Sequence, residues 1–228
     1  MKRWVGFVLC LVGFAALVFS MILDSVDAVG TDPELYYQLQ MEAGVLETAG
    51  ISEADLRRVD GALADCLKGD PDALNFEIEV FGRVQPVFNE KELIHMEDCR
   101  QLFGLLRRVL VSADTLAVCG LVIGVLWLKD KRKIRLAGWI EPLVIVVPLG
   151  AFAAWAALDF NSAFNFFHEI LFTNDLWLLS PRTDLLIRIC PASMFMNMGV
   201  RIGVYSLIWT LLILILTTVF TRVKKERE

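Results

Sequence analysis

The two histidines of the sequence, His95 and His168, are the side chains best suited to move a proton near neutral pH. Asp98 and Cys99 follow His95 by three and four positions, so the three side chains would share one face of a helix. A carboxylate at this spacing can hold an imidazole in one tautomer, and an imidazole can activate a thiol. Two interpretations stay open, namely a catalytic cluster, or a surface His–Asp pair beside a Cys that is only a small buried residue.

His168 lies in an aromatic segment, residues 159–172, with Asn161 and Asn165 seven and three positions before it. This composition is typical of a helix at a membrane interface, where a polar group is costly unless it is satisfied or used. Arg201, further along the chain, could hold a lipid phosphate, a substrate carboxylate or a developing oxyanion, or could pair with Asp184.

The other classes of site are poorly supported. Five Cys without C-x-x-C spacing and only two His argue against a zinc or iron–sulfur site, so we expect no metal. There is no glycine-rich phosphate loop, and we expect no cofactor. A formal net charge of -5 argues against nucleic acid as a partner.

The chain must position these side chains in a membrane. Its 228 residues are 56% hydrophobic and only 21% charged, with a mean hydropathy of +0.57, which excludes an ordinary soluble domain and a disordered chain. Apolar stretches of about 20 residues can cross the hydrocarbon core. We expect membrane helices at residues 1–23, 109–128, 138–158 and 199–221, joined by segments 24–108, 129–137 and 159–198 and followed by a tail, 222–228.

The distribution of charge predicts the orientation. Lys and Arg gather at the N-terminus, at residues 129–135 and at residues 222–227, as they do on the cytoplasmic side. Residues 24–100 instead contain 18 acidic and six basic residues. We therefore predict that both termini are cytoplasmic, that segments 24–108 and 159–198 lie outside, and that the first span is an uncleaved signal anchor.

Local signals predict a mostly helical outer subdomain. Asp32-Pro33-Glu34 and Ser52-Glu53-Ala54-Asp55 each begin a helix, the first ending at Gly44 or Gly50 and the second at Gly69. Alternation from Phe76 to Val84 indicates a short half-buried strand or hairpin around Gly82. The fold class predicted is an all-α polytopic membrane protein with four transmembrane helices and this small subdomain.

One helix should carry the first histidine into the membrane. Asn89-Glu90-Lys91-Glu92 is a capping box, and nothing breaks the helix between it and the second span. Both histidines would then lie at the same outer surface of the membrane.

Two segments resemble the signatures of a bacterial family of four-span membrane proteins, the lipoprotein intramolecular transacylases. Asn89-Glu90-Lys91-Glu92-Leu93-Ile94-His95-Met96-Glu97-Asp98-Cys99-Arg100 is similar to the first signature, although Cys99 stands where an apolar residue such as Val is expected. The second runs from Phe167 and His168 through Asn174, Trp177, Asp184 and Pro191 to Phe195. The family's two functional histidines correspond to His95 and His168.

The resemblance implies an enzyme of lipoprotein modification in the bacterial cytoplasmic membrane, with its active site at the outer face. Its partners would be membrane lipids and a diacylglyceryl lipoprotein, whose sn-2 acyl chain moves to the α-amino group of the N-terminal Cys and leaves a lyso-form lipoprotein. Exchange of an ester for an amide needs no ATP, and both reacting groups belong to one molecule.

The roles follow as hypotheses. His168 would be the base, because aromatic surroundings favour a neutral imidazole, and His95 would donate to the ester oxygen or the leaving alkoxide with Asp98 fixing its tautomer. Glu92, Asn165 and Arg201 are candidate supporting residues. The reverse assignment of the histidines is about equally compatible with the sequence.

Two other functions remain open. A non-enzymatic membrane chaperone or sensor would explain the acidic outer loop, but it would not explain why the sharpest motifs centre on the two histidines. An acyltransferase with a separate phospholipid donor would use the same acid–base groups and would need two substrate grooves.

Overall fold

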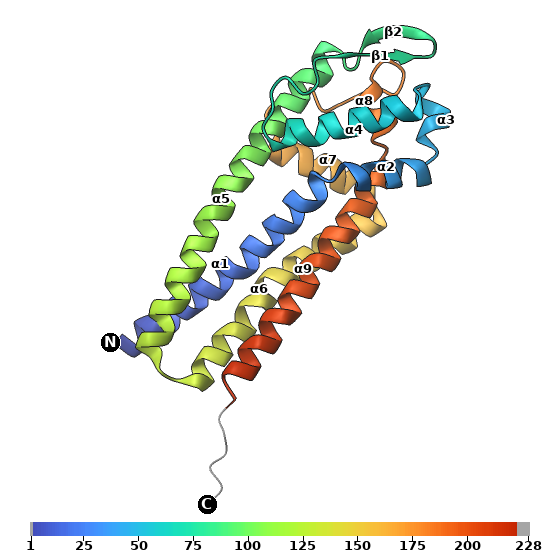
Figure 1. The fold of residues 1–228 in the computed structure, drawn as a ribbon. Coiled ribbons are helices and arrows are strands. Elements are labelled where there is room, and N and C mark those ends of the chain that lie inside the picture. The colour runs from blue at the N-terminus through green and yellow to red at the C-terminus, as the bar shows by residue number, and fades with distance from the viewer. Residues whose placement is uncertain (1, 223–228) are drawn as a thin grey trace, which may run out of the picture. The chain divides into compact units, whose positions relative to one another are not determined.

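The computed structural model describes residues 2–222, which form nine α-helices and a two-stranded antiparallel sheet (Figure 1). The elements are α1 (Lys2–Gly30), α2 (Pro33–Glu42), α3 (Val45–Ala49), α4 (Glu53–Lys68), β1 (Glu77–Val80), β2 (Arg83–Pro86), α5 (Glu90–Leu128), α6 (Lys131–Leu158), α7 (Phe160–Leu171), α8 (Leu185–Ile189) and α9 (Ala192–Phe220). Residues 223–228 of the expected cytoplasmic tail lie outside the described residues.

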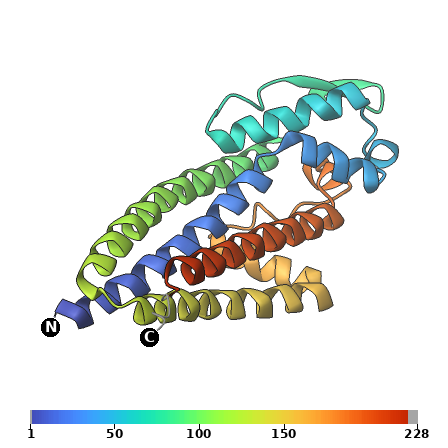
Figure 2. The same ribbon diagram turned by 60° about the horizontal axis from the view of Figure 1, so that its bottom comes forward.

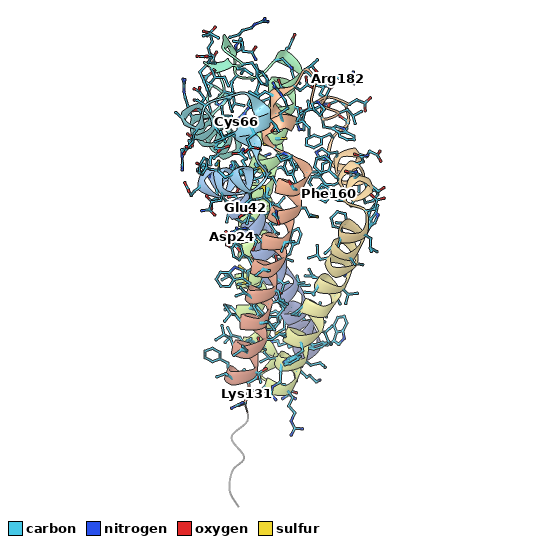
Figure 3. The ribbon with its side chains drawn as sticks, turned by 90° about the vertical axis from the view of Figure 1, so that its right-hand side faces the viewer. Asp24, Glu42, Cys66, Lys131, Phe160 and Arg182 are labelled. Carbon is cyan, nitrogen blue, oxygen red and sulfur yellow. The ribbon has the colours of Figure 1, made fainter. Side chains whose placement is uncertain are left out.

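The chain divides into two compact units. The first takes in the residues up to Ser25, Arg107–Ala153 and the part from Ile202, and the second takes in Val26–Leu106 and Ala154–Arg201. The second unit has many polar side chains, visible as oxygen and nitrogen atoms, whereas the side chains on the helices of the first unit are mostly apolar (Figure 3). Both histidines belong to the second unit.

Four helices within the described residues are long and apolar enough to cross a membrane, namely α1, α5, α6 and α9. The predicted fold class, with four such helices and one small hairpin, is confirmed. Helix α5 has 39 residues and is therefore about 58 Å long, nearly twice the thickness of a hydrocarbon core. Its residues 90–108 precede the apolar stretch that begins at Val109, and His95 lies in that earlier part.

In the first unit, glycines let α1 and α5 pack backbone against backbone. The two helices run side by side (Figure 2), and a Cβ built on Gly124 would lie 2.8 Å from the backbone nitrogen of Cys10. A Cβ on Gly13 would lie equally close to the nitrogen of Leu121. Small residues at such crossings are a common device in membranes, where helix association depends on close packing.

The same unit has a buried cluster and a polar tie between α6 and α9. The buried members of the cluster are Cys10, Phe14, Val18, Leu128, Ala137 and Ile213. Arg135 of α6 donates to the hydroxyl of Thr221 at 2.9 Å and to its carbonyl oxygen at 2.6 Å. The guanidinium thereby satisfies two acceptors at the end of α9.

In the second unit, the predicted helix boundaries coincide with capping contacts. Asp32 Oδ1 accepts from the backbone nitrogens of Glu34 and Leu35, and Ser52 Oγ accepts from that of Asp55. Gly44 and Gly50 both have left-handed backbones, so the first helical stretch is split into α2 and α3.

The hairpin is tight. Val80 pairs with Arg83, and the two residues between them, Phe81 and Gly82, have φ values of 49° and 79°. Positive φ at both central positions is the conformation of a type I′ turn, which matches the twist of the flanking strands. The strand β1 buries Ile78 and Val80 and exposes its two glutamates, as the alternating sequence predicts.

A buried polar pair joins α2 to α4. Gln40 Nε2 donates to Asp60 Oδ1 at 2.9 Å, and both side chains are almost inaccessible to solvent. Gln40 Oε1 and Asp60 Oδ2 have no hydrogen-bond partner among the described residues. A proton on Asp60 Oδ2 would turn one of these two buried acceptors into a donor. Burial accordingly raises the pKa of Asp60 to about 7.

This pair predicts a pH-dependent stability. In the unfolded chain the carboxyl has a pKa of about 3.9, so between about pH 4 and pH 7 the folded state holds a proton that the unfolded state has lost. The protonated Asp60 therefore contributes fully to the free energy of unfolding below pH 4. This contribution is lost as the pH rises to 7, which lowers the free energy of unfolding by roughly 4 kcal/mol. Replacing Asp60 with Asn should remove this dependence, as measured by denaturant unfolding in detergent at several pH values.

A control on the same helix separates this effect from a general change of charge. Asp65→Asn alters an exposed carboxylate and should keep the wild-type pH dependence. If Asp60→Asn were as pH-dependent as the wild type, the proton would belong to another group.

Candidate active site

The two histidines meet, although 73 positions separate them in the sequence. His95 comes from α5 and His168 from α7, and their ring centroids lie 6.2 Å apart with the planes inclined by 37°. Each side chain is only 8% exposed. Two titratable imidazoles are thus held together in a largely dry environment.

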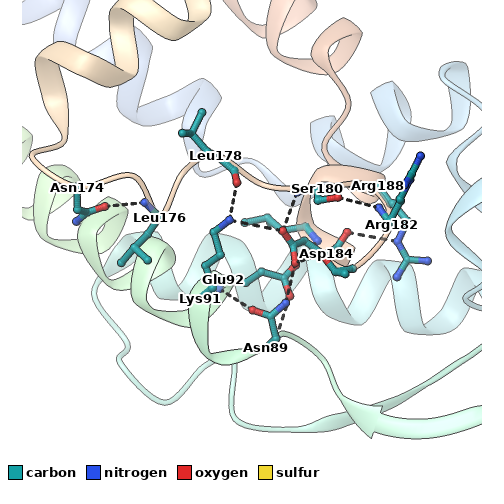
Figure 4. Close-up of polar contacts among 12 residues, drawn as sticks. Asn89, Lys91, Glu92, Asn174, Leu176, Leu178, Ser180, Arg182, Asp184 and Arg188 are labelled. Atoms are coloured by element: carbon teal, nitrogen blue, oxygen red, sulfur yellow. Dashed lines mark hydrogen bonds and ion pairs between the residues drawn. The ribbon is translucent and has the colours of Figure 1, made fainter.

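Helix α5 begins at a reciprocal capping box. The backbone nitrogen of Asn89 donates to Glu92 Oε2 at 2.8 Å, and that of Glu92 donates to Asn89 Oδ1 at 3.1 Å. Glu92 Oε1 also accepts from the backbone nitrogen of Leu186, the second residue of α8, at 2.6 Å. Figure 4 shows Glu92 beside Asn89. The carboxylate is 1% exposed, and its burial raises its pKa. Glu92 therefore ties the start of α5 to α8 and supports the site from a distance.

The segment between α7 and α8 is fastened to α5 at several points. Asn174 Nδ2 donates to Asp98 Oδ2 at 2.9 Å, and Asn89 Nδ2 donates to Asp184 Oδ1 at 3.0 Å. Lys91 donates to the carbonyl oxygen of Leu178 (Figure 4). These contacts hold the segment that carries Trp177 against the helix of His95.

Aromatic rings surround His168. Helix α7 begins at Phe160 (Figure 3), where Asp159 Oδ1 caps it by accepting from the nitrogen of Ser162. The ring centroids nearest to His168 are those of Phe164 at 4.1 Å, Trp177 at 4.9 Å, Phe167 at 5.4 Å and Phe172 at 5.6 Å. The rings of Trp177 and Phe172 are stacked on the imidazole. This enclosure disfavours the imidazolium, and burial lowers the pKa of His168.

One hydrogen bond defines the tautomer of His168. Its Nδ1 lies 2.7 Å from the carbonyl oxygen of Phe164, one helical turn earlier. A carbonyl oxygen can only accept, so Nδ1 carries the proton and the lone pair is on Nε2. The neutral His168 is therefore a proton acceptor at Nε2.

His95 is buried without a partner at one nitrogen. Its Nδ1 has no hydrogen bond among the described residues, and its Nε2 lies 3.7 Å from Cys99 Sγ. Burial and the neighbouring imidazole of His168 lower the pKa of His95 to about 4, against an opposite effect of Asp98. At neutral pH the ring is uncharged and can donate from one nitrogen and accept at the other.

The other residues predicted from the sequence are placed as follows. Asp98 accepts a hydrogen bond from Asn174, and none joins it to His95 within the described part of the chain. Asn165 is exposed, unlike His168. Arg201, the last residue of the second unit, is half-buried and has no hydrogen bond or ion pair among residues 2–222. Its suggested partner, Asp184, is instead bound by Asn89, Ser180 and Thr183.

Neither a metal cluster nor a disulfide is present in the described residues. They contain no group of three or more His, Cys, Asp or Glu side chains placed to hold a metal ion. Cys66 and Cys99 are free thiols, like the other three cysteines.

Three contacts around the two histidines were missed by sequence reasoning. Trp177 stacks on His168, Phe172 contacts both imidazoles, and Asn174 binds Asp98. A signal was available, since Asn174 and Trp177 both stand in the second quoted motif. Periodicity alone does not indicate which ring a distant Trp will meet.

Comparisons with known proteins agree with this architecture. A family model described as lipoprotein intramolecular transacylase Lit matches residues 11–195. The solved in meso structure of the lipoprotein intramolecular transacylase Lit from Bacillus cereus has a TM-score of 0.74 and 23% identity, over 92% of this chain and 93% of that one. Two variants of it, with one histidine replaced by Arg or Ala, give TM-scores of 0.72 and 0.71 at 22% identity, over 94% of this chain and 91% and 92% of theirs.

A comparison with curated proteins finds no match. The structural likeness establishes the fold, and the family model extends over most of the chain, including both histidine motifs. The protein therefore belongs to the lipoprotein intramolecular transacylase family of membrane-integral acyltransferases.

Proposed function

We propose that the protein moves the sn-2 acyl chain of a diacylglyceryl lipoprotein to the α-amino group of the lipoprotein's N-terminal Cys. The observation that carries this proposal is the pair of buried, neutral imidazoles 6.2 Å apart, one with a free lone pair on Nε2 and the other with an unpartnered Nδ1. Nitrogen forms a bond to the acyl carbon and the ester C–O bond breaks. The free amine loses one proton on attack and the glyceryl oxygen gains one. When the amine starts as ammonium, it first gives a further proton to the base, which passes it to solvent, so no other reactant is needed.

His168 acts as the base. An α-amino group has a pKa of about 7.7 to 8.0 and is largely ammonium at neutral pH, so it must lose a proton before or during attack. Nε2 of His168 is ready to accept that proton, because its Nδ1–H is held by Phe164. The stacked rings of Trp177 and Phe172 keep water from the imidazole and stabilise its neutral form.

His95 serves the ester. Its neutral ring donates a hydrogen bond to the oxygen on which negative charge develops, first on the carbonyl and then on the departing alkoxide. Removing a donor of this kind from a dry site commonly lowers kcat by about 10²- to 10³-fold. Asp98, Asn174 and Glu92 act through the positions of the helices and contact no reacting atom in this scheme.

The site needs no added source of energy. An amide is more stable than an ester, so the transfer runs downhill, and donor and acceptor are parts of one substrate. The contribution of the protein is to hold amine and ester in an attack geometry, which can lower the barrier by about 7 to 11 kcal/mol.

We place the segments and termini of this membrane-integral protein as its charge distribution predicts. The four spans, 1–23, 109–128, 138–158 and 199–221, lie in the bacterial cytoplasmic membrane, with the N-terminus, 129–137 and 222–228 inside and 24–108 and 159–198 outside. Membrane lipids and the lipoprotein then reach the histidines from the outer leaflet. Reporter fusions after Gly82 and after Lys131 test this orientation, and a cytoplasmic signal at Gly82 would refute it.

The function is tested by mass spectrometry of the N-terminal lipopeptide of a model lipoprotein, made in a host that produces only the diacylglyceryl form. We expect one acyl chain to move from glycerol to nitrogen at unchanged total mass. A gain of one acyl group would indicate a separate phospholipid donor, and an unchanged lipopeptide would favour a partner-binding chaperone or sensor. Either result would overturn the proposal.

A further inference from the structure

We propose that Cys99 is a positioning residue that donates its S–H to Nε2 of His95 and thereby keeps the proton of that imidazole on Nδ1. The inference deepens the proposed function, and it rests on that function for its catalytic consequence. The thiol touches no reacting atom and acts only through His95.

The geometry is that of neighbours on one helical face. Cys99 follows His95 by one turn of α5, and its Sγ lies 3.7 Å from Nε2, within hydrogen-bond distance for sulfur. The described residues offer Nε2 no other partner, and they give the Cys99 thiol no other hydrogen bond. His95 and Cys99 therefore satisfy each other.

The sulfur is a thiol here. Burial raises the pKa of Cys99 to about 12, and the nearby Asp98 and Cys66 add to this effect. Since the thiolate is the nucleophile, a thiol with so high a pKa is a poor acceptor of an acyl group. The proton that stays on sulfur is available for a hydrogen bond.

The direction of that bond follows from the two partners. An imidazole lone pair is a good acceptor, whereas a thiol sulfur is a weak one, so S–H to Nε2 is the better arrangement. The ring proton is then on Nδ1, the buried nitrogen that has no partner among the described residues. Leaving a buried donor unpaired costs about 1 to 3 kcal/mol, and such an atom in a native structure calls for a functional reason. An ester oxygen of the substrate would satisfy it.

The two histidines then differ in their roles although both carry the proton on Nδ1. In His168 a backbone carbonyl takes up Nδ1–H, so Nε2 is free to accept. In His95 a thiol takes up Nε2, so Nδ1–H is free to donate. The hydrogen-bond partner of each ring thus determines whether the histidine acts as a base or as a hydrogen-bond donor.

The test compares Cys99→Val, which removes the donor, with Cys99→Ser, which keeps one. Cys119→Val, at an exposed position of the same helix, is the matched control. Because the chain has two histidines, ¹⁵N-labelled histidine gives two ring systems, which a His168→Ala sample assigns. Turnover is followed by lipopeptide mass spectrometry, and an unchanged His168 signal verifies that each variant is folded.

We expect the wild-type His95 to carry its proton on Nδ1, and Cys99→Val to shift it towards Nε2. Turnover should fall about tenfold with KM unchanged, as for loss of one neutral hydrogen bond that acts in the transition state. Cys99→Ser should restore both the tautomer and most of the turnover, and Cys119→Val should change neither.

A wild-type His95 protonated on Nε2, or a Cys99→Val variant with unchanged tautomer and turnover, would overturn the inference. Failure of the proposed function gives a different result. In that case the tautomer still depends on Cys99, but the wild-type protein moves no acyl chain within the lipoprotein.

Discussion

Replacing His168 with Ala should lower kcat by about 10²- to 10⁴-fold, the usual contribution of a general base. The attacking amine would keep its proton, because the residue that accepts it at Nε2 is gone. The aromatic rings of Phe164, Phe172 and Trp177 that surround His168 would remain, so the KM for the lipoprotein should change much less than kcat. The measurement is the initial rate of lyso-lipoprotein formation in detergent or liposomes.

Two experiments separate lost chemistry from lost folding. Added imidazole should partly rescue His168→Ala, since the variant leaves a ring-sized space between aromatic side chains. Glu169→Gln, the exposed next residue of α7, should retain the wild-type rate. A His168→Ala protein that elutes as a folded species and still turns over at near the wild-type rate would remove His168 from the mechanism.

The local architecture around the site was predictable because its signals lie within a few residues of each other. The Asn89–Glu92 capping box begins α5, Asp32 and Ser52 begin α2 and α4, and the hairpin turns at Gly82. In each case a side chain meets the backbone two or three positions away, or a glycine adopts positive φ. Such contacts depend on little else in the fold.

The long-range contacts of the site were predicted less well. The expected partner of His95 was Asp98, one turn away, but Asp98 accepts from Asn174 and His95 contacts Cys99. On a helix, i+3 and i+4 compete for the same side chain, and a partner 76 positions away can decide the competition. The residues near His95 in the sequence do not indicate that Asn174 will bind Asp98.

Glu92 shows the same limit. The capping box identified its contact with Asn89, but the second carboxylate oxygen binds the nitrogen of Leu186, 94 positions later. A fully buried carboxylate that accepts two backbone hydrogen bonds holds two helix starts together. The motif predicted Glu92 as a supporting residue, but its long-range contact with Leu186 could not be read from the motif.

His95→Ala is expected to lower kcat by about 10²- to 10³-fold, the loss typical of one donor to a developing oxyanion. Its Nδ1, buried and without a partner in the described residues, would no longer reach the ester oxygen. His168 would still accept the proton of the amine, so some turnover should remain. Rates from lipopeptide mass spectrometry at saturating substrate measure the effect, and Ile94→Ala, at an exposed neighbouring position, is the control.

The double variant decides whether the two imidazoles act together. If His95 and His168 serve the same transition state, His95→Ala/His168→Ala should be little slower than the slower single variant, because groups that act as a unit are far from additive. Fully multiplied effects would instead mean independent roles, for instance substrate binding by one ring and chemistry by the other. The contact of Phe172 with both rings favours the first result, since removal of either imidazole disturbs the same enclosure.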